Sequence, residues 1–300
     1  MKKQKNDFHG VILLDKPTGM TSNSALQRVK HGFNAKKAGH TGSLDPLATG
    51  LLPICLGQAT KISEYLLNSH KRYTTIIKLG ETTETLDSEG DIVTRKPVDV
   101  CEEQLQSSLT QFRGDIKQVP PMYSALKKDG QPLYKLARKG EVIERPARDM
   151  TVYSLEAKRV DELHVELYVH CSSGFYIRSL AHDLGQVLGC GAHVVELRRT
   201  DIKAINVSLA HSLEHVLESK LDDILLPLDV LIEHMPKIEI SDAQALSMLQ
   251  GKPTLANGLV TVELTRFYQP SGYLFGVGKV SDDGFIKAQK TFINTAGKHL

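Results

Sequence analysis

Residues 38–50 read AGHTGSLDPLATG, and one carboxylate, Asp45, stands among three glycines with a proline directly behind it. Glycine admits backbone conformations that a side chain forbids, and the residue before a proline is driven out of the helical region. The stretch therefore predicts a loop that holds Asp45 on a fixed, non-helical backbone. The same composition also describes an ordinary surface turn, so the pattern alone leaves both interpretations open.

The segments around this loop show strand and helix patterns. Residues 10–19, GVILLDKPTG, predict a short buried strand that ends in a Pro-Gly turn. Residues 22–33, SNSALQRVKHGF, predict a helix that begins with a Ser or Asn cap. Residues 71–80, KRYTTIIKLG, predict a strand with Tyr73 near its start.

A strand, a turn and a helix follow farther along the chain. Residues 162–171, ELHVELYVHC, alternate between polar and apolar side chains, which predicts a strand packed on the face that carries Val165, Leu167, Val169 and Cys171. Residues 176–189, YIRSLAHDLGQVLG, predict a helix that stops at Gly189 and begins beside Tyr176 and Arg178. The apolar residues at helical spacing are Ile177, Leu180, Ala181, Leu184, Val187 and Leu188.

The pattern changes at about residue 236. Residues 241–251, SDAQALSMLQG, predict a capped helix with a glycine stop. Three short alternating runs follow, LVTVELTRF, YLFGVGKV and GFIKAQKTF, and the turn SDDG joins the last two. We therefore expect a small β-rich module appended to a mixed α/β domain.

Length and composition predict an ordinary globular protein. The chain has 300 residues, 41% hydrophobic and 24% charged, enough for a large domain with or without a small one. The basic start, MKKQKNDFHG, leads into an apolar run too short for a signal sequence or a membrane span, so we expect a cytoplasmic protein that does not contact membranes. The four cysteines form no CxxC pair and are expected to be reduced core residues: Cys55, Cys101, Cys171 and Cys190.

Basic side chains gather in one segment. The net charge of +2 is too small to indicate a nucleic-acid-binding protein by itself. Residues 125–148, ALKKDGQPLYKLARKGEVIERPAR, contain seven Lys or Arg against three acidic residues. Such a run could contact RNA phosphates or form a solvated helix and loop, and spacing does not decide between them. The candidates for contacts with an RNA backbone are Lys127, Lys128, Arg138 and Lys139.

The motifs of several large enzyme classes are missing from the sequence. It has no P-loop, dinucleotide fingerprint, HExxH or GxSxG motif. His40 and Asp45 are five residues apart, but no further ligand lies nearby in sequence, so we do not expect a metal site. A lone, positioned carboxylate can serve as a nucleophile or a general base, and an arginine such as Arg178 could hold it ionised.

Several long motifs resemble a known family. The central one is AGHTGSLDPLATGLLPICLGQATK, with GVILLDKPTGMTS before it and KRYTTIIKLG, PPMYSALKKDGQPLYKLARKG and CSSGFYIRSLAHDLGQVLGCGAHVVELRRT after it. Together they resemble the bacterial TruB type of tRNA pseudouridine synthase, densely from about residue 10 to 203. The C-terminal part resembles the PUA domain of that family more loosely.

The resemblance implies a fold and a domain organisation. It implies a mixed, α+β pseudouridine-synthase fold, with a largely antiparallel sheet and a central RNA-binding cleft, in residues 1–235. This catalytic domain includes a basic RNA-contacting insertion at about residues 121–149. Residues 236–300 are then expected to form a small β-rich, PUA-like RNA-binding domain.

The resemblance also implies a reaction. The T-arm uridine of tRNA, at position 55, is flipped out, its glycosidic bond is cleaved, and the base is reattached through C5 as pseudouridine. The reaction needs no cofactor, and the expected partner is the T-arm stem-loop of tRNA, with no obligate protein partner. A stacked base must be extruded before its C1′ is accessible, at a cost of a few kcal/mol. Aromatic stacking recovers about 1 to 3 kcal/mol per base.

The resemblance assigns roles to six residues. Asp45 matches the catalytic aspartate, and Arg178 is implied to form an ion pair with it. His40 is assigned to the space that the flipped uridine leaves. The resemblance places Tyr73 and Tyr176 against the flipped base and Leu197 in the substrate pocket.

Other interpretations remain open at the level of the residues. The two tyrosines could pack in the core, the arginine could be a surface cation and the leucine simple filler. A non-catalytic tRNA-binding or RNA-folding protein would use the same cleft without turnover. A phosphotransferase with an aspartyl-phosphate intermediate would need Mg²⁺ ligands, which the sequence does not show.

Overall fold

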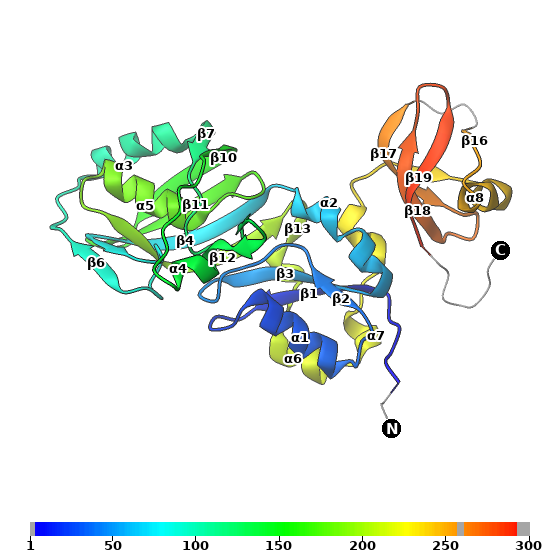
Figure 1. Cartoon of the computed structure of the whole chain (residues 1–300), viewed down its shortest axis with the longest axis horizontal. Helices are drawn as coiled ribbons and strands as arrows, with labels where there is room; N and C mark the ends of the chain where they lie inside the picture. The colour runs from blue at the N-terminus through cyan, green and yellow to red at the C-terminus, as the bar shows by residue number, and fades with distance from the viewer. Residues whose placement is uncertain (1–3, 257–260, 293–300) are drawn as a thin grey trace.

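The structure is a computed structural model that describes residues 4–256 and 261–292. It places a large mixed sheet at one end of the molecule and a small C-terminal sheet at the other (Figure 1). Within the described ranges, no helix is both long and apolar enough to cross a membrane.

The large sheet is mainly antiparallel, which confirms the expected α+β class. Along its main path the order is β14-β1-β3-β12-β4-β11-β10-β7, with β2 paired to β3 and β13 to β12. The pairings of β1 with β14 and of β3 with β12 are parallel, and the others are antiparallel. The strands are β1 (Gly10–Lys16), β2 (Ala38–His40), β3 (Thr49–Leu56), β4 (Lys71–Leu79), β7 (Gly114–Gln118), β10 (Arg148–Arg159), β11 (His164–Cys171), β12 (Ala192–Ile202), β13 (Ile205–Asn206) and β14 (His211–Ser212).

Helices and short hairpins surround this sheet. The α-helices of the large domain are α1 (Ser22–Gly32), α2 (Ser63–Leu67), α3 (Glu102–Ser108), α4 (Leu133–Ala137), α5 (Ile177–Val187), α6 (Leu213–Glu218) and α7 (Leu221–Ile224). The 3₁₀ helices are η1 (Gly57–Lys61), η2 (Leu109–Phe112), η3 (Val207–Leu209) and η4 (Leu228–Ile232). Two hairpins pair β5 (Glu81–Thr83) with β6 (Ile92–Arg95) and β8 (Lys127–Lys128) with β9 (Gln131–Pro132).

The alternating pattern of β11 correctly predicts which of its faces is packed. The side chains of Val165, Leu167, Val169 and Cys171 are buried in the main core. Helix α5 lies on the same core through Ile177, Leu180, Ala181 and Leu184. This packing holds the N-terminus of α5 beside the sheet and so positions Tyr176 and Arg178.

Two local predictions are wrong. The cap of α1 is Thr21, whose side chain accepts from Ser24 N–H, and not a Ser or Asn. Cys101 is exposed because it precedes α3 on the surface, whereas the other three cysteines are buried and all four are free.

The C-terminal module is β-rich, as expected. Its five strands are β15 (Lys237–Glu239), β16 (Thr254–Leu255), β17 (Val262–Tyr268), β18 (Leu274–Val280) and β19 (Phe285–Thr291), in the order β15-β17-β18-β19-β16. Helix α8 (Asp242–Leu249) is capped by Ser241, which forms part of a capping box. The start of the expected strand LVTVELTRF and the chain end after residue 292 lie outside the described residues.

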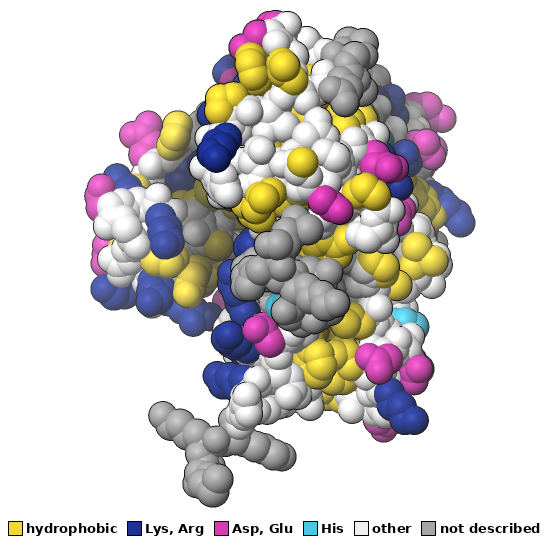
Figure 2. All heavy atoms as spheres, turned by 90° about the vertical axis from the view of Figure 1, so that its right-hand side faces the viewer, with side chains coloured by type: hydrophobic (Ala, Val, Ile, Leu, Met, Phe, Trp, Pro, Cys, Tyr) yellow, Lys and Arg dark blue, Asp and Glu magenta, His cyan; other side chains and the backbone are white. Residues whose placement is uncertain are grey.

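The module is packed against the large domain. Tyr268, Leu274, Val277 and Phe292 share one buried apolar cluster with residues of the large domain such as Ile62. Polar contacts flank the cluster: the first is from Lys61 Nζ to the Thr291 carbonyl, at 2.7 Å, and the second joins Lys290 and Glu64, at 3.2 Å. Figure 2 looks onto this module and shows Lys and Arg side chains more densely gathered along the left side of the view.

Candidate active site

The loop that carries Asp45 connects β2 to β3 and is held at both flanks. Gly42 and Gly50 have φ values of 115° and 104°, in the region that favours glycine. Ser22 on α1 donates to the Leu44 carbonyl at 3.0 Å and accepts from the Leu44 N–H at 2.7 Å. The Asp45 carbonyl accepts from Ala48 N–H at 3.1 Å, which closes a turn around Pro46. The loop is therefore a fixed support and not an ordinary surface turn.

A buried lysine holds the residue behind Asp45. Lys16 at the end of β1 donates its Nζ to the carbonyls of Pro17 and Met20 at 2.8 Å and of Pro46 at 3.4 Å. Burial lowers the pKa of Lys16 to about 8, and Asp45 opposes that shift. The turn after β1 and the loop of Asp45 are therefore tied together.

Arg178 forms an ion pair with Asp45. Its Nε lies 2.9 Å from Asp45 Oδ2, and the arginine side chain is only 4% exposed. The same guanidinium donates from Nη1 to the Thr85 carbonyl at 2.9 Å and from Nη2 to the Tyr123 carbonyl at 2.8 Å. Three separate segments therefore fix the counter-charge of the carboxylate.

A second carboxylate, Asp87, flanks Arg178. Its Oδ2 lies 3.4 Å from Arg178 Nη1, and its side chain is 3% exposed. Asp87 Oδ1 accepts from the Thr85 hydroxyl at 2.5 Å and from Glu89 N–H at 3.1 Å. The Arg178 guanidinium thus lies between Asp87, which is fixed by the fold, and Asp45, which faces the cavity.

Opposing effects act on the protonation of Asp45. Burial of the carboxyl group raises its pKa, and the charge of Asp87 adds to the rise. The Arg178 guanidinium lowers the pKa and so opposes the rise. The side chain is 39% exposed, so the carboxylate is accessible from the cavity.

Asp45 opens into a cavity of about 540 Å³. The structure brings five of the six residues implied by the resemblance onto its wall: Asp45, Tyr73, Tyr176, Arg178 and Leu197. They come from the β2–β3 loop, β4, the start of α5 and β12, so segments far apart in sequence meet at one place. The volume lies in the range of small-molecule sites.

The two tyrosines are held differently. Tyr73 lies on β4 directly opposite Arg199 on β12, and the Arg199 charge opposes the effect of burial on its pKa. Burial raises the pKa of Tyr73 to about 12. Tyr176 caps α5, and its backbone N–H and carbonyl both bond the side-chain amide of Gln118, at 2.8 and 3.0 Å.

His40 does not line this cavity. It ends β2, and its Nδ1 is buried with no hydrogen-bond partner among the described residues. Burial and the nearby Arg199 charge lower the pKa of His40, which favours the neutral ring.

The four cations chosen as RNA contacts lie on the insertion between β7 and β10. Lys127 and Lys128 form β8, Arg138 and Lys139 follow α4, and all four side chains are exposed. Arg148, at the far end of the same segment, lines the cavity. The segment is thus exposed and connected to the cavity, but its exposure alone does not assign it to RNA.

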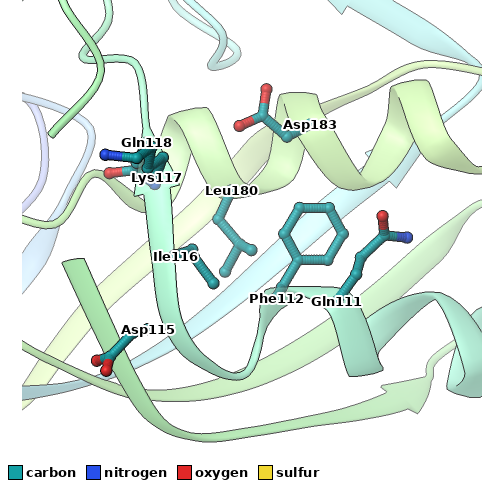
Figure 3. Close-up of a pocket in the computed structure, with 8 residues that line it drawn as sticks. All are labelled: Gln111, Phe112, Asp115, Ile116, Lys117, Gln118, Leu180 and Asp183. Atoms are coloured by element: carbon teal, nitrogen blue, oxygen red, sulfur yellow. The ribbon is translucent and has the colours of Figure 1, made fainter. Parts of the chain in front are cut away.

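Other sites in the described part of the chain offer less. No group of three or more His, Cys, Asp or Glu residues there could hold a metal ion. A second cavity of about 260 Å³ lies between η2, β7 and α5 (Figure 3). Its centre is apolar, with Phe112, Ile116 and Leu180, and Asp183 projects from α5 at its edge (Figure 3). It contains none of the six residues that the resemblance assigns.

Sequence reasoning missed Asp87, Arg199, Lys16 and Gln118. Lys16 lies in the motif GVILLDKPTGMTS, and Arg199 lies in ELRRT, the end of the last motif that resembles the family. The resemblance could therefore have indicated both residues. Asp87 and Gln118 carry no local signal, because their partners Arg178 and Tyr176 are about 60 to 90 residues away in sequence.

Comparison with known families covers nearly the whole chain. Residues 30–177 match the model "TruB family pseudouridylate synthase (N terminal domain)". Residues 178–233 match "tRNA pseudouridylate synthase B C-terminal domain", and residues 236–291 match "Pseudouridine synthase II TruB, C-terminal".

Solved structures share the fold. An "H/ACA RNP bound to a substrate RNA containing 2'-deoxyuridine" contains a chain that is 25% identical, with a TM-score of 0.72 over 95% of this chain and 86% of that one. A chain of a "Cbf5-Nop10-Gar1 Complex" is 28% identical, with a TM-score of 0.72 over 95% of this chain and 85% of that one.

Curated proteins give the strongest similarity. A "tRNA pseudouridine synthase B" of Stutzerimonas stutzeri is 50% identical over 297 residues, which are 97% of each chain. One of Pseudomonas aeruginosa is 47% identical over 297 residues, 97% of this chain and 98% of that one. With this identity along nearly its whole length, the chain belongs to the TruB family of tRNA pseudouridine synthases, which are isomerases.

Proposed function

We propose that this protein converts the T-arm uridine of tRNA, at position 55, to pseudouridine, with Asp45 as the nucleophile. One observation carries the proposal: an ionisable carboxylate that faces the cavity is paired at 2.9 Å with a buried arginine, and tyrosines line the same cavity. The names of the relatives support tRNA as the substrate.

The chemistry needs one carboxylate and no redox partner. The Asp45 carboxylate attacks C1′ of the flipped uridine, and the C1′–N1 bond breaks. The uracil turns, C5 bonds to C1′, and Asp45 is released. One proton leaves C5 and one is taken up at N1, so atoms and electrons balance within the nucleotide.

Arg178 keeps this carboxylate reactive. Burial favours the protonated form of Asp45, which cannot act as a nucleophile. The guanidinium opposes that effect, and its bonds to the carbonyls of Thr85 and Tyr123 hold it in place beside the carboxylate. The site therefore maintains an anion that faces the cavity.

The flipped base has its contacts in the same cavity. Tyr73 and Tyr176 present rings to it, and Leu197 provides an apolar wall. Stacking on such rings is worth about 1 to 3 kcal/mol per base, enough to offset much of the cost of extrusion. His40 lies outside this wall, and we assign it to the space that the uridine leaves when it is flipped out.

The exposed cations extend the site toward the RNA backbone. We place phosphate contacts at Lys127, Lys128, Arg138 and Lys139, because they are exposed on a segment that reaches the cavity at Arg148. Residues 1–235 are then the catalytic domain and residues 236–300 a PUA-like domain that adds RNA contacts. The start of a separate family match at residue 236 supports this division.

We also propose that the enzyme needs no protein partner and works in the cytosol, where tRNA is used. An unmodified tRNA transcript incubated with the purified protein should gain one pseudouridine, and a transcript with cytidine at position 55 should gain none. Binding without any pseudouridine would favour the RNA-folding alternative. Loss of activity on EDTA treatment, restored by one divalent ion, would favour metal-dependent chemistry.

A further inference from the structure

Arg199 is a buried cation whose contacts are neutral oxygens. It lies on β12, is 1% exposed, and lines the cavity of Asp45. Its Nε donates to the Leu51 carbonyl at 2.8 Å, and its Nη2 donates to the Gly42 carbonyl at 3.1 Å. Its Nη1 lies 3.5 Å from the Ser43 carbonyl. A buried charge is costly unless it is hydrogen-bonded, so these contacts account for how it is tolerated.

These carbonyls lie on both sides of Asp45. Gly42 precedes Asp45 by three residues, and Leu51 follows it by six. The backbone of Arg199 also pairs with Gly50 in the parallel contact of β12 with β3. This contact is so close that a Cβ on Gly50 would lie 2.3 Å from the Arg199 carbonyl oxygen. One residue thus fixes the entry and the exit of the loop.

Arg199 is also the cross-strand neighbour of Tyr73. The two residues are direct partners in the β4–β12 register, and both line the cavity of Asp45. The positive charge of Arg199 opposes the rise that burial causes in the pKa of Tyr73, so the two side chains interact electrostatically. The guanidinium that binds the loop of Asp45 therefore belongs to the residue that lies opposite Tyr73.

We propose that Arg199 is a positioning residue that holds the loop of Asp45 at a fixed place relative to β4 and Tyr73 across the cavity. The proposal rests on the proposed function, since it assigns the effect to the step at C1′. A lysine would keep the charge but not the role, because one ammonium group cannot donate along the fixed directions of a guanidinium fork.

Two substitutions test the proposal, Arg199→Lys and Arg199→Gln, with Arg198→Lys as the matched control. Arg198 is the neighbouring residue on β12, and its guanidinium pairs with Asp15 at 2.6 Å, away from the cavity lining. Three quantities are measured on the full chain: the single-turnover rate of pseudouridine formation, the Kd for tRNA, and amide hydrogen exchange of peptides from residues 42–51 and from β11.

We expect the single-turnover rate of both Arg199 variants to fall by about 10- to 100-fold, the scale for misplaced reacting groups. Their Kd for tRNA should stay within about twofold, because the lost contacts act on the chemical step. Exchange in residues 42–51 should rise by about fivefold or more while β11 is unchanged, as local opening predicts. Arg198→Lys should match the wild type in all three.

A wild-type rate in Arg199→Lys, or unchanged exchange in residues 42–51, would overturn the proposal. Two further results would show that Arg199 has a purely structural role and would also overturn the proposal. The first is a rate of pseudouridine formation that falls only in proportion to tRNA affinity, and the second is hydrogen exchange that rises equally in β11. The proposed function has its own test, because it fails if the wild-type protein makes no pseudouridine. In that case, the hydrogen-exchange measurement still shows whether Arg199 holds the loop of Asp45.

Discussion

The Nε atom of Arg178 lies 2.9 Å from Oδ2 of Asp45, and the arginine is fixed independently of the aspartate by carbonyls of two other segments. The pair is therefore asymmetric: the cation is rigid and buried, whereas the carboxylate is accessible from the cavity. Such an arrangement suits a group that must remain charged until substrate arrives.

Substitution of Arg178 should affect the chemical step more than binding. Arg178→Met removes the only cation within 4.0 Å of the Asp45 carboxylate in the described part of the chain, and leaves Asp87 buried without its ion-pair partner. We expect the single-turnover rate to fall by about 10² or more, as for loss of an electrostatic contact in an active site. Quench-flow with labelled tRNA measures this rate, and a fall in affinity alone would contradict the assignment.

The pH dependence of the rate follows from the raised pKa of Asp45. Only the carboxylate reacts, so activity is present above the pKa and is lost as the pH falls through it. Because burial raises this pKa, the acid limb should lie above the ordinary value near ~4. In Arg178→Lys, the ammonium group stabilises the Asp45 carboxylate less well than the guanidinium does. The acid limb of this variant should therefore move to higher pH. An unchanged limb in the variant would show that Arg178 does not control Asp45.

Tyr73→Phe separates stacking from the role of the hydroxyl. The pKa of about 12 keeps the phenol protonated at neutral pH, which makes proton removal from C5 demanding. If the hydroxyl takes part, the variant should bind tRNA nearly normally and form pseudouridine slower by about 10². A rate close to the wild type would leave Tyr73 as a stacking surface only, with the proton leaving through another group or water.

The exposed cations should determine the salt dependence of binding. Neutralising Lys127, Lys128, Arg138 and Lys139 together should flatten the slope of log Kd against log salt concentration, because fewer counterions are released. Fluorescence titrations at several salt concentrations measure the slope, with Lys96→Gln, an exposed lysine just after β6, as the control. An unchanged slope would show that the segment is only solvated.

The elements that the sequence predicted best are those with strong local patterns. The alternation in β11, the apolar spacing in α5 and the Gly189 stop all follow from the period of the side chains and from the freedom of glycine. The cap of α1 was placed wrongly because Thr21, Ser22 and Asn23 are all good caps, and only the backbone conformation selects the threonine.

The candidate site was predicted through family resemblance more than through pattern. Composition described the loop of Asp45 equally well as a surface turn, and the contacts that make it rigid come from Ser22, Lys16 and Arg199 in other parts of the chain. The partner Asp87 could not be predicted locally, since its burial depends on how the β5–β6 hairpin meets Arg178. Tertiary contacts, which no window of sequence contains, decide such features.

The central claim is that the Asp45 carboxylate is the nucleophile. Asp45→Asn keeps the shape of the side chain but cannot form the bond to C1′. The direct measurement is pseudouridine at position 55 of tRNA after prolonged single-turnover incubation with this variant, with tRNA affinity determined in parallel. We predict no detectable product and an affinity within a few fold of the wild type, whereas substantial pseudouridine formation would contradict the account.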